Sequence, residues 1–453
     1  MVKYFATVAG LVAAGLLQGC PVFPLPPACA DGGACPAGFV CGTDLYCHGG
    51  GGSGTGGTGT GGSTGRTATG GTTNGSSTGG GNSSGSTAGS SGTGGSSSGG
   101  TTGGAPCYCP ACPASAGGLP LPPVDGGITP RANLVGVIVG GEYLFAIGGQ
   151  DSCGKDTGLI EVYDTLNHQN GWRHAVDVAN VNVPDLNVSN GAIGAQYLSA
   201  VGVLNGGNPA GVVTIGGIAG GATNDQTLAI VQYGASWLNE GALPEPIAHA
   251  AAVVDANGCV ELIGGRSPGD GGIGQTLSSI ETLCDPFSAG HVSGAAWSDA
   301  GFALLQPISD EAVAQDAAGT TYVLGGQVAA VEYSHYAWSI DPAFTGVSGF
   351  PSTQAAHFRG GAAVLGTTLY AVAGSDSLTD GPQTDVESYD LTQGDAGVWV
   401  SQSSLSLNLP REGFATFSDG SNIYVVGGVG PGNVIYGNME VYTSGSSGWV
   451  LVP

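Results

Sequence analysis

Short apolar runs that end in a pair of small residues recur from Ile128 to the end of the chain. The six runs read YLFAIGG, VVTIGG, VELIGG, TYVLGG, LYAVAG and IYVVGG, and their pairs are Gly148-Gly149, Gly216-Gly217, Gly264-Gly265, Gly325-Gly326, Ala373-Gly374 and Gly427-Gly428. Another apolar run precedes each, and a segment with an acidic or polar residue near an aromatic follows. A tryptophan then opens a last short run in five copies: Trp172, Trp237, Trp297, Trp399 and Trp449. Apolar runs of this length between turn residues predict β-strands.

Each copy therefore predicts about four short strands within roughly 54 residues. A single four-stranded sheet cannot bury both of its faces, but six sheets packed around an axis can. The order of glycine pair, aromatic-Asp and tryptophan resembles the kelch repeat of β-propellers. The sequence thus predicts an all-β, six-bladed kelch-type β-propeller over 128–453. Three departures stand out: Ala373 replaces a glycine, the fourth copy has Trp338 one strand early, and the second carries an insertion around 181–200.

The N-terminus has the pattern of an export signal. Lys3 is its only charge, and an apolar run from Tyr4 to Leu17 follows, too short to span a bilayer. The run ends in Leu17-Gln18-Gly19-Cys20, which resembles the lipobox of bacterial lipoproteins. That resemblance implies a signal peptide over 1–19, lipidation of Cys20 and stable membrane anchoring through several acyl chains. Pro21 stands where an aspartate would indicate inner-membrane retention, so we expect the outer membrane.

Four cysteines spaced six apart, Cys29, Cys35, Cys41 and Cys47, predict a small disulfide module over 20–48. The alternative, a zinc knuckle using His48, fits an exported chain less well, and the sequence does not choose among the three possible disulfide pairings. The module loosely resembles cysteine motifs of exported myxobacterial proteins. Cys259 and Cys284 fall in one repeat and could bridge neighbouring strands, and Cys153 could pair with a cysteine between 107 and 112.

A linker is predicted over 49–127, between the module and the propeller. Of the 56 residues from Gly49 to Gly104, 53 are Gly, Ser, Thr or Asn. Such a segment has almost no apolar surface to bury, so we expect it to be disordered and to act as a tether. Its last part is rich in cysteine and proline.

The charge of the chain excludes one class of partner. Eight Lys and Arg residues stand against 33 Asp and Glu, a net charge of −25, of which the propeller carries −24. Nucleic-acid binding requires a basic surface, which so few cations cannot provide.

Ligands of kelch propellers meet one face, built partly from the loops that follow the glycine pairs. By that resemblance, the candidates for the ligand face are Arg131, Arg266, Arg359, Arg411, Gln150 and Gln327. The arginines would hold a carboxylate or a sugar by paired hydrogen bonds. The alternative is that each forms an ion pair between blades.

The residues predict neither a cofactor nor a metal site. The loop Ser375–Gly381 with Asp385 could offer oxygens to calcium, but its spacing does not match an EF-hand. No catalytic residue is predicted, since the propeller sequence contains no GxSxG elbow, no HExxH and no P-loop motif. The sequence favours a lipid-anchored binding protein of the cell envelope, with a protein or polysaccharide as partner. The alternative is a sugar-acting enzyme on the same scaffold, similar to sialic-acid mutarotases or to galactose oxidase, which would need an arginine and a carboxylate in the central pocket.

Overall fold

The computed structural model describes residues 39–41, 47–49, 127–178, 181–188, 194–205, 208–231, 236–268, 274–284, 297–329, 332–377 and 381–452. The predicted signal peptide, Cys20, Cys29, Cys35 and the linker lie outside these residues. Within the predicted cysteine module, β1 (Phe39–Cys41) pairs with β2 (Cys47–Gly49), and the register sets Cys41 opposite Cys47. Their side chains are outside the described part of the chain, so the predicted disulfide pairing there stays a prediction.

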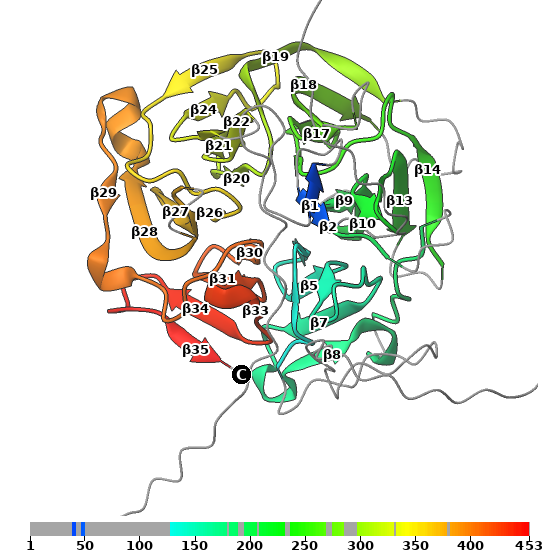
Figure 1. Ribbon diagram of the computed structural model, residues 1–453. Helices are drawn as coiled ribbons and strands as arrows, with labels where there is room; N and C mark the ends of the chain where they lie inside the picture. The colour runs from blue at the N-terminus through cyan, green and yellow to red at the C-terminus, as the bar shows by residue number, and fades with distance from the viewer. Residues whose placement is uncertain are drawn as a thin grey trace, which may run out of the picture.

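Six antiparallel sheets, five with four strands and that of blade 3 with a fifth short strand, stand around a central axis and form a six-bladed kelch-type propeller (Figure 1). Blades 1 to 3 consist of β4 (Val135–Val139), β5 (Tyr143–Ile147), β7 (Ile160–Asp164), β8 (Trp172–His174); β9 (Ser199–Asn205), β10 (Asn208–Ile215), β13 (Gln226–Val231), β14 (Leu238–Ala242); and β15 (Ala251–Val254), β16 (Val260–Ile263), β18 (Gln275–Leu283), β19 (Ser298–Ile308). Blades 4 to 6 consist of β20 (Ala312–Gln315), β21 (Thr321–Leu324), β24 (Ala337–Ile340), β25 (Val347–Phe350); β26 (Gly361–Leu365), β27 (Thr368–Ser375), β28 (Pro382–Asp390), β29 (Val400–Ser401); and β30 (Ala415–Ser418), β31 (Asn422–Val426), β34 (Met439–Thr443), β35 (Val450–Val452).

Short elements connect and extend the blades. The additional strands are β3 (Arg131–Ala132), β6 (Gln150–Asp151), β11 (Ile218–Ala219), β12 (Ala222–Thr223), β17 (Arg266–Ser267), β22 (Gln327–Ala329), β23 (Glu332–Tyr333), β32 (Val429–Gly430) and β33 (Val434–Ile435). The helices are single 3₁₀ turns or short runs of them: η2 (His168–Asn170), η3 (Ala175–Asp177), η4 (Leu391–Ala396), η5 (Ser403–Leu405) and η6 (Pro431–Asn433). Among the described residues, no helix is long and apolar enough to cross a bilayer.

The core lies between blades. The second strand of each blade is mostly apolar and buried on both faces, as in β16 and β21, where all four residues are buried, the carboxyl residue Glu261 among them. Leu144 and Trp172 of blade 1 pack with Phe417 and Met439 of blade 6 in one apolar cluster. Each sheet therefore buries its second face only against the next sheet, which is the reason that the six repeats fold together.

Tryptophan fixes the outer strands to the preceding blade. Four indole N–H groups donate across the blade boundary: Trp237 to the Pro184 carbonyl at 2.9 Å, Trp297 to Thr227 Oγ1 at 2.8 Å, Trp399 to the Pro351 carbonyl at 2.7 Å and Trp449 to the Leu405 carbonyl at 2.6 Å. The inserted segment of the second copy takes part, because Val181, Val183, Leu186 and Val188 are buried in the cluster between blades 1 and 2. Blade 4 lacks this tryptophan in β25, and Trp338 is buried on β24 instead.

The glycine pairs join successive blades. Gly148 and Gly149 have φ angles of 65° and 100°, and the Gly149 N–H donates to the Ala195 carbonyl of blade 2 at 2.9 Å. A Cβ on Gly148 would lie 2.5 Å from the same carbonyl oxygen, so both the conformation and the close approach favour glycine. In the fifth copy, Ala373 takes the first position with φ 48°, a left-handed conformation that costs roughly 1–2 kcal/mol for alanine.

The ring closes between blades 6 and 1 by packing and hydrogen bonds. Gly428 N donates to the Arg131 carbonyl at 3.0 Å, the same contact that the other glycine pairs make. In the inner strands, Gly136 of β4 packs against Phe417 of β30. Blade 1 is built from 135–174 and blade 6 from 415–452, so no described strand is exchanged between the two ends of the domain.

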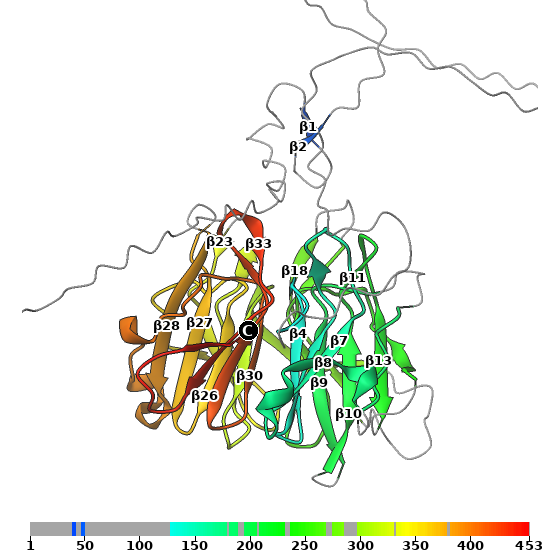
Figure 2. The same ribbon diagram turned by 90° about the horizontal axis from the view of Figure 1, so that it is seen from below.

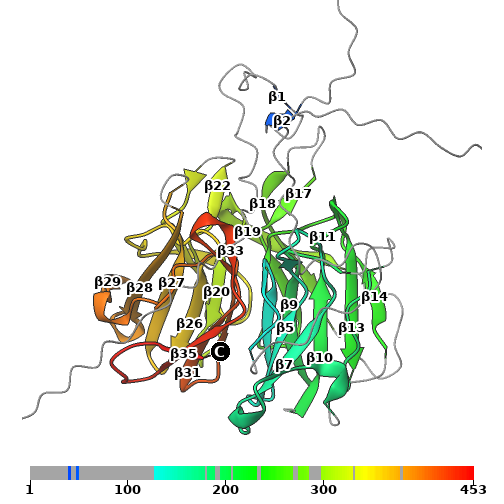
Figure 3. The ribbon, with the colours of Figure 1, turned by 60° about the horizontal axis from the view of Figure 1, so that its bottom comes forward.

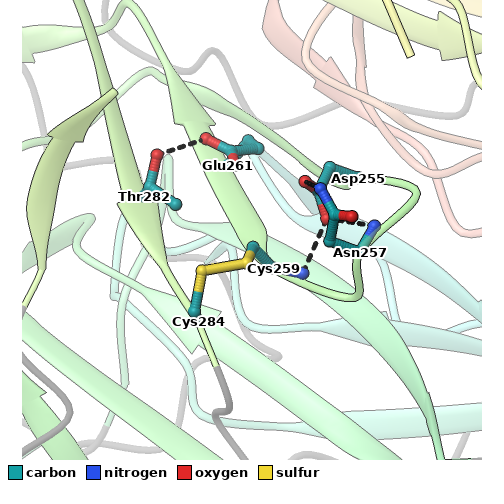
Figure 4. The surroundings of a disulfide bond; sticks show 6 residues. All are labelled: Asp255, Asn257, Cys259, Glu261, Thr282 and Cys284. Atoms are coloured by element: carbon teal, nitrogen blue, oxygen red, sulfur yellow. Dashed lines mark hydrogen bonds between the residues drawn. A yellow bond between two sulfur atoms is a disulfide. The ribbon is translucent and has the colours of Figure 1, made fainter. Parts of the chain in front are cut away.

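Blade 3 contains the predicted disulfide between Cys259 and Cys284, whose Cα atoms are 4.2 Å apart (Figure 4). The bond joins the start of β16 to the end of β18. Next to it, Asp255 accepts the backbone N–H groups of Asn257 and Cys259, which closes the turn from β15 into β16. Cys153 is disulfide-bonded as well, while the cysteines between 107 and 112 lie outside the described residues.

Candidate functional site

The loops that follow the glycine pairs gather at one end of the propeller, where Figures 2 and 3 show β11 and β33. In every blade, the residue after the pair bridges to the segment that enters the innermost strand. The six bridges are Gln150–Ala132, Ile218–Gln196, Arg266–Ala248, Gln327–Ser309, Ser375–Phe358 and Val429–Glu412. The repeat therefore fixes the chain in the same way six times at this end.

In each entry segment, the residue that follows the bridged residue belongs to a closed ring of backbone hydrogen bonds. The N–H of this residue donates to the carbonyl of the equivalent residue in the preceding blade, at 2.7 to 3.2 Å. All six residues have positive φ angles, between 52° and 60°. We call this set the axial ring: Asn133, Tyr197, His249, Asp310, Arg359 and Gly413. The ring brings together side chains that are far apart in the sequence.

A cavity of about 110 Å³ lies at the axial ring. Its wall is formed by the ring residues and by those that follow them: Leu134, Val135, Leu198, Ala250, Glu311, Gly360 and Phe414. We call it the axial pocket. It is smaller than the roughly 300–1,000 Å³ usual for a small-molecule site, so it has room only for part of a larger ligand.

Four ring side chains form one polar network in the axial pocket. The imidazole of His249 stacks on the ring of Tyr197, with centroids 3.8 Å apart, and His249 Nδ1 is 2.6 Å from Asp310 Oδ1. Arg359 Nε donates to the same Asp310 oxygen at 3.1 Å, and its guanidinium lies 4.8 Å from the Tyr197 ring centre. Blades 5 and 2 stand opposite each other (Figure 1), so Arg359 reaches across the axis.

Burial and neighbouring charges set the protonation states in the pocket. Burial alone would raise the pKa of Asp310, but His249 and Arg359 hold that pKa well below its usual range. Burial lowers the pKa of His249 despite Asp310, and burial raises the pKa of Tyr197. Burial also raises the pKa of Glu311 well above that of a free carboxyl group. These shifts favour the carboxylate form of Asp310 and the uncharged forms of His249, Tyr197 and Glu311.

Arg359 remains charged. Burial would lower the pKa of its guanidinium, but Tyr197, Asp310 and Glu412 raise it overall. Its side chain is 22% exposed, and Nη1 is 3.8 Å from Glu412 Oε1. The guanidinium therefore hydrogen-bonds Asp310 through Nε and has Glu412 within ion-pair distance of Nη1, two carboxylates that come from the preceding and the following blade.

Two further sets of hydrogen-bonded polar side chains stand at the rim of the pocket. Arg266 Nη2 donates to Gln327 Oε1 at 2.7 Å and to Ser309 Oγ at 3.2 Å. The Ser375 hydroxyl donates to Glu412 Oε2. The structure therefore places the predicted Arg266, Gln327 and Arg359 at the same end of the propeller. Gln150 is half-buried on β6, where its side chain hydrogen-bonds Asp156.

Arg131 and Arg411 lie elsewhere, since both are fully buried inside their own blades. Arg131 pairs with Glu161 and donates to the Ala146 carbonyl at 2.9 Å. Arg411 pairs with Glu440 at 2.8 Å and donates to the Gly427 carbonyl at 2.8 Å. These pairs lie within a blade, not between blades, and they tie the entry segment to the third strand. Arg131 and Arg411 do not face the axis because the axial-ring residues of their blades stand two places later, at 133 and 413.

The sequence alone did not identify the axial residues Asn133, Tyr197, His249 and Asp310 as candidates. They differ from copy to copy, so no motif marks them. Aligning the six copies on the residue two places before each innermost strand would have found them, because that position is equivalent in all blades.

In the loop considered for calcium, the carboxylate of Asp376 is already used by a backbone hydrogen bond. Asp376 Oδ1 accepts the Ala356 N–H at 2.8 Å. Within the ranges that the structure describes, no three His, Cys, Asp or Glu side chains are grouped so that they could hold a metal ion.

Comparisons with known proteins support the fold. No family model matches the chain, and no curated protein does. Among solved structures, that of a protein named YjhT is similar, with a TM-score of 0.55 over 73% of this chain and 99% of YjhT. At 14% identity, the likeness is one of fold. The chain is thus a kelch-type propeller in architecture, and its site has to be interpreted from its own residues.

Proposed function

We propose that this protein is an exported, lipid-anchored binding protein of the cell envelope, and that the end of the propeller around the axial pocket binds a protein or a polysaccharide. The observation that carries the proposal is the position of Arg359. Its guanidinium crosses the axis, lines the pocket and is held in place by Asp310 and the Tyr197 ring. A preorganised donor group in a concave site is what ligand recognition requires.

The anchor is proposed from the sequence. Leu17-Gln18-Gly19-Cys20 matches a lipobox, and the following linker would hold the propeller away from the membrane, most simply the outer membrane. Labelling cells with an alkyne-tagged fatty acid tests this directly. The wild-type protein is expected to incorporate the label and the Cys20→Ala variant to lose it; equal labelling would contradict the anchor.

Binding is tested with the purified full chain on a glycan array and in a pull-down from envelope extract. Arg359→Met is expected to abolish capture of the ligand. Lys155→Met is the matched control, because Lys155 is exposed on a loop at the same end and its loss removes the same charge. Capture that is equal in both variants would show that the axial pocket is not the binding site.

A sugar-acting enzyme is the second candidate. The observation that favours it is the pair of His249 and Asp310 beside Tyr197 and Arg359, since an imidazole held by a carboxylate can transfer protons to a sugar ring. NMR can follow the interconversion of sugar anomers with the wild-type protein and His249→Gln. A rate that equals the uncatalysed one for every sugar tested would exclude the mutarotase form of this candidate.

A further inference from the structure

The axial pocket combines several charged groups with no excess of either sign. Arg359 and Asp310 lie inside it, and Arg266 and Glu412 stand at its rim, two positive and two negative charges. For the remaining titratable groups that face it, Tyr197, His249 and Glu311, burial favours the uncharged form. The site therefore has no local net charge with which to attract an ion.

The net negative charge of the surrounding domain repels negatively charged ligands. The propeller carries a net charge of −24, so its long-range field opposes the approach of acidic polymers. The only two cations near the pocket are already next to Asp310, Glu412 or the Gln327 amide. An acidic ligand would gain little attraction from these two cations, and the charge of the domain would repel it as it approaches.

The shape of the pocket restricts how a ligand enters. The six hydrogen bonds of the axial ring narrow the axis, and the Arg359 side chain crosses it. A polymer cannot thread the propeller at this level, so only a chain end or a protruding group fits. The ends of peptides carry an ammonium or a carboxylate group, whereas the ends of neutral polysaccharides carry hydroxyl groups alone.

The unused polar atoms of the pocket suit hydroxyl groups. Asn133 Oδ1 and Glu311 Oε2 are buried with no hydrogen-bond partner in the described part of the chain, and Arg359 supplies donors. Each hydroxyl group both donates and accepts, so one sugar end can satisfy donors and acceptors that lie side by side. A buried polar atom without a partner costs the free protein roughly 1–3 kcal/mol, so a ligand hydroxyl that reaches such an atom on binding would gain part of that energy.

From this geometry, and resting on the proposed binding function, we infer that the axial pocket binds the uncharged end of a neutral saccharide chain. Arg359 donates to its hydroxyl or ring oxygens, Asn133 and Glu412 accept from its hydroxyls, and Leu134, Leu198 and Phe414 pack against its apolar faces.

The test is calorimetric titration of the full chain with gluco-, galacto- and manno-oligosaccharides and with matched oligosaccharides that end in a uronic acid. One neutral series is expected to bind at least about tenfold more tightly than its acidic counterpart. Its affinity should change less than about twofold between 50 and 500 mM salt, because screening acts only on interactions between charges. Arg359→Met should lower the affinity by about tenfold or more, because the substitution removes a hydrogen-bond donor group from the pocket. Lys155→Met should leave the affinity unchanged, and a thermal melt of each variant shows that it is folded.

The outcomes separate the two proposals. Preference for the acidic series, or for a peptide, with the same dependence on Arg359 would overturn the saccharide assignment and leave the axial pocket as the binding site. Neutral-sugar binding that Arg359→Met does not weaken would overturn the assignment to this pocket. Absence of binding to every oligosaccharide and peptide would contradict both.

Discussion

Glu261 is a carboxyl group buried inside blade 3, only 2% exposed, on the strand that starts at the disulfide (Figure 4). The Thr282 hydroxyl donates to its Oε2 at 2.7 Å. Burial raises its pKa to about 7, and this one hydrogen bond lowers it only in part. The folded protein therefore keeps a proton on Glu261 over a pH range in which the unfolded chain has lost it.

This proton makes the free energy of unfolding depend on pH. Below the unfolded pKa of 4.5 both states hold the proton, so the contribution of Glu261 is fully present there. It falls as pH rises from 4.5 through about 7 and is constant above. At about 1.4 kcal/mol per pKa unit, the loss is roughly 3–4 kcal/mol. Denaturant titrations between pH 4 and 9 should show it in the wild type and much less in Glu261→Gln; identical pH profiles would refute the assignment.

The buried Arg411–Glu440 pair is expected to be structural. Arg411→Met leaves the Glu440 carboxylate buried without its cation, which typically costs about 3–5 kcal/mol of unfolding free energy. Arg359→Met, at a partly exposed position, should cost clearly less. Urea denaturation of the two variants compares them, and equal losses would mean that Arg411 is no more structural than Arg359. Replacing both partners, Arg411→Met with Glu440→Met, should recover much of the loss.

At this scale, the sequence predicted residue types better than positions. It identified Arg359, Arg266 and Gln327, which lie at the axial-ring end, and it treated Arg131 and Arg411 as their equivalents. Whether a side chain faces the axis or the blade interior depends on a shift of two residues around a left-handed ring residue. That shift is set by the hydrogen-bonded ring between blades, which a single repeat does not reveal.

At the scale of elements, the strands and glycine pairs were predictable because their cause is local. An apolar run with β-branched residues forms a strand, and a pair of positive φ angles favours glycine. The disulfide was predictable as well, because Cys259 and Cys284 flank two strands of one repeat and the register sets them opposite each other. The small ribbons, such as β11–β12 and β32–β33, were not, since they are only two residues long per strand and carry no periodic signal.

Removing the disulfide should destabilise blade 3. The bond closes a loop between residues 25 positions apart, and such a constraint on the unfolded chain is usually worth about 2–4 kcal/mol. The double variant Cys259→Ala, Cys284→Ala should therefore unfold at a lower denaturant concentration. A midpoint equal to that of the oxidised wild type would contradict this, and the reduced wild-type protein provides the control.

For the whole molecule, six copies of one strand pattern were enough to predict a propeller and the number of blades. Closure of the ring was not predictable, because it uses no exchanged strand and depends on the close packing of inner strands from opposite ends of the domain. A Cβ on Gly136 would lie 2.6 Å from the Phe417 ring, so this contact has no spare room.

Gly136→Ala tests that closure. The extra methyl group should force blades 1 and 6 apart and cost roughly 1–3 kcal/mol, as overpacking usually does. Gly349→Ala is the matched control, because Gly349 lies in β25 with nothing within 4 Å of the added Cβ. Its effect on the unfolding free energy should be close to zero or stabilising. Equal effects of the two substitutions would mean that the contact between the first and last blades is loose.

Hydrogen–deuterium exchange with a bound ligand tests the central claim, that the axial-ring end is the binding face. The probe is the neutral oligosaccharide that binds most tightly in the calorimetric series. Exchange should slow in peptides that contain the ring positions Tyr197, His249, Asp310, Arg359 and Gly413. The turns at the opposite end, 140–142, 255–258, 316–319 and 419–421, should exchange as before. Protection confined to those turns or to the outer strands would contradict the account.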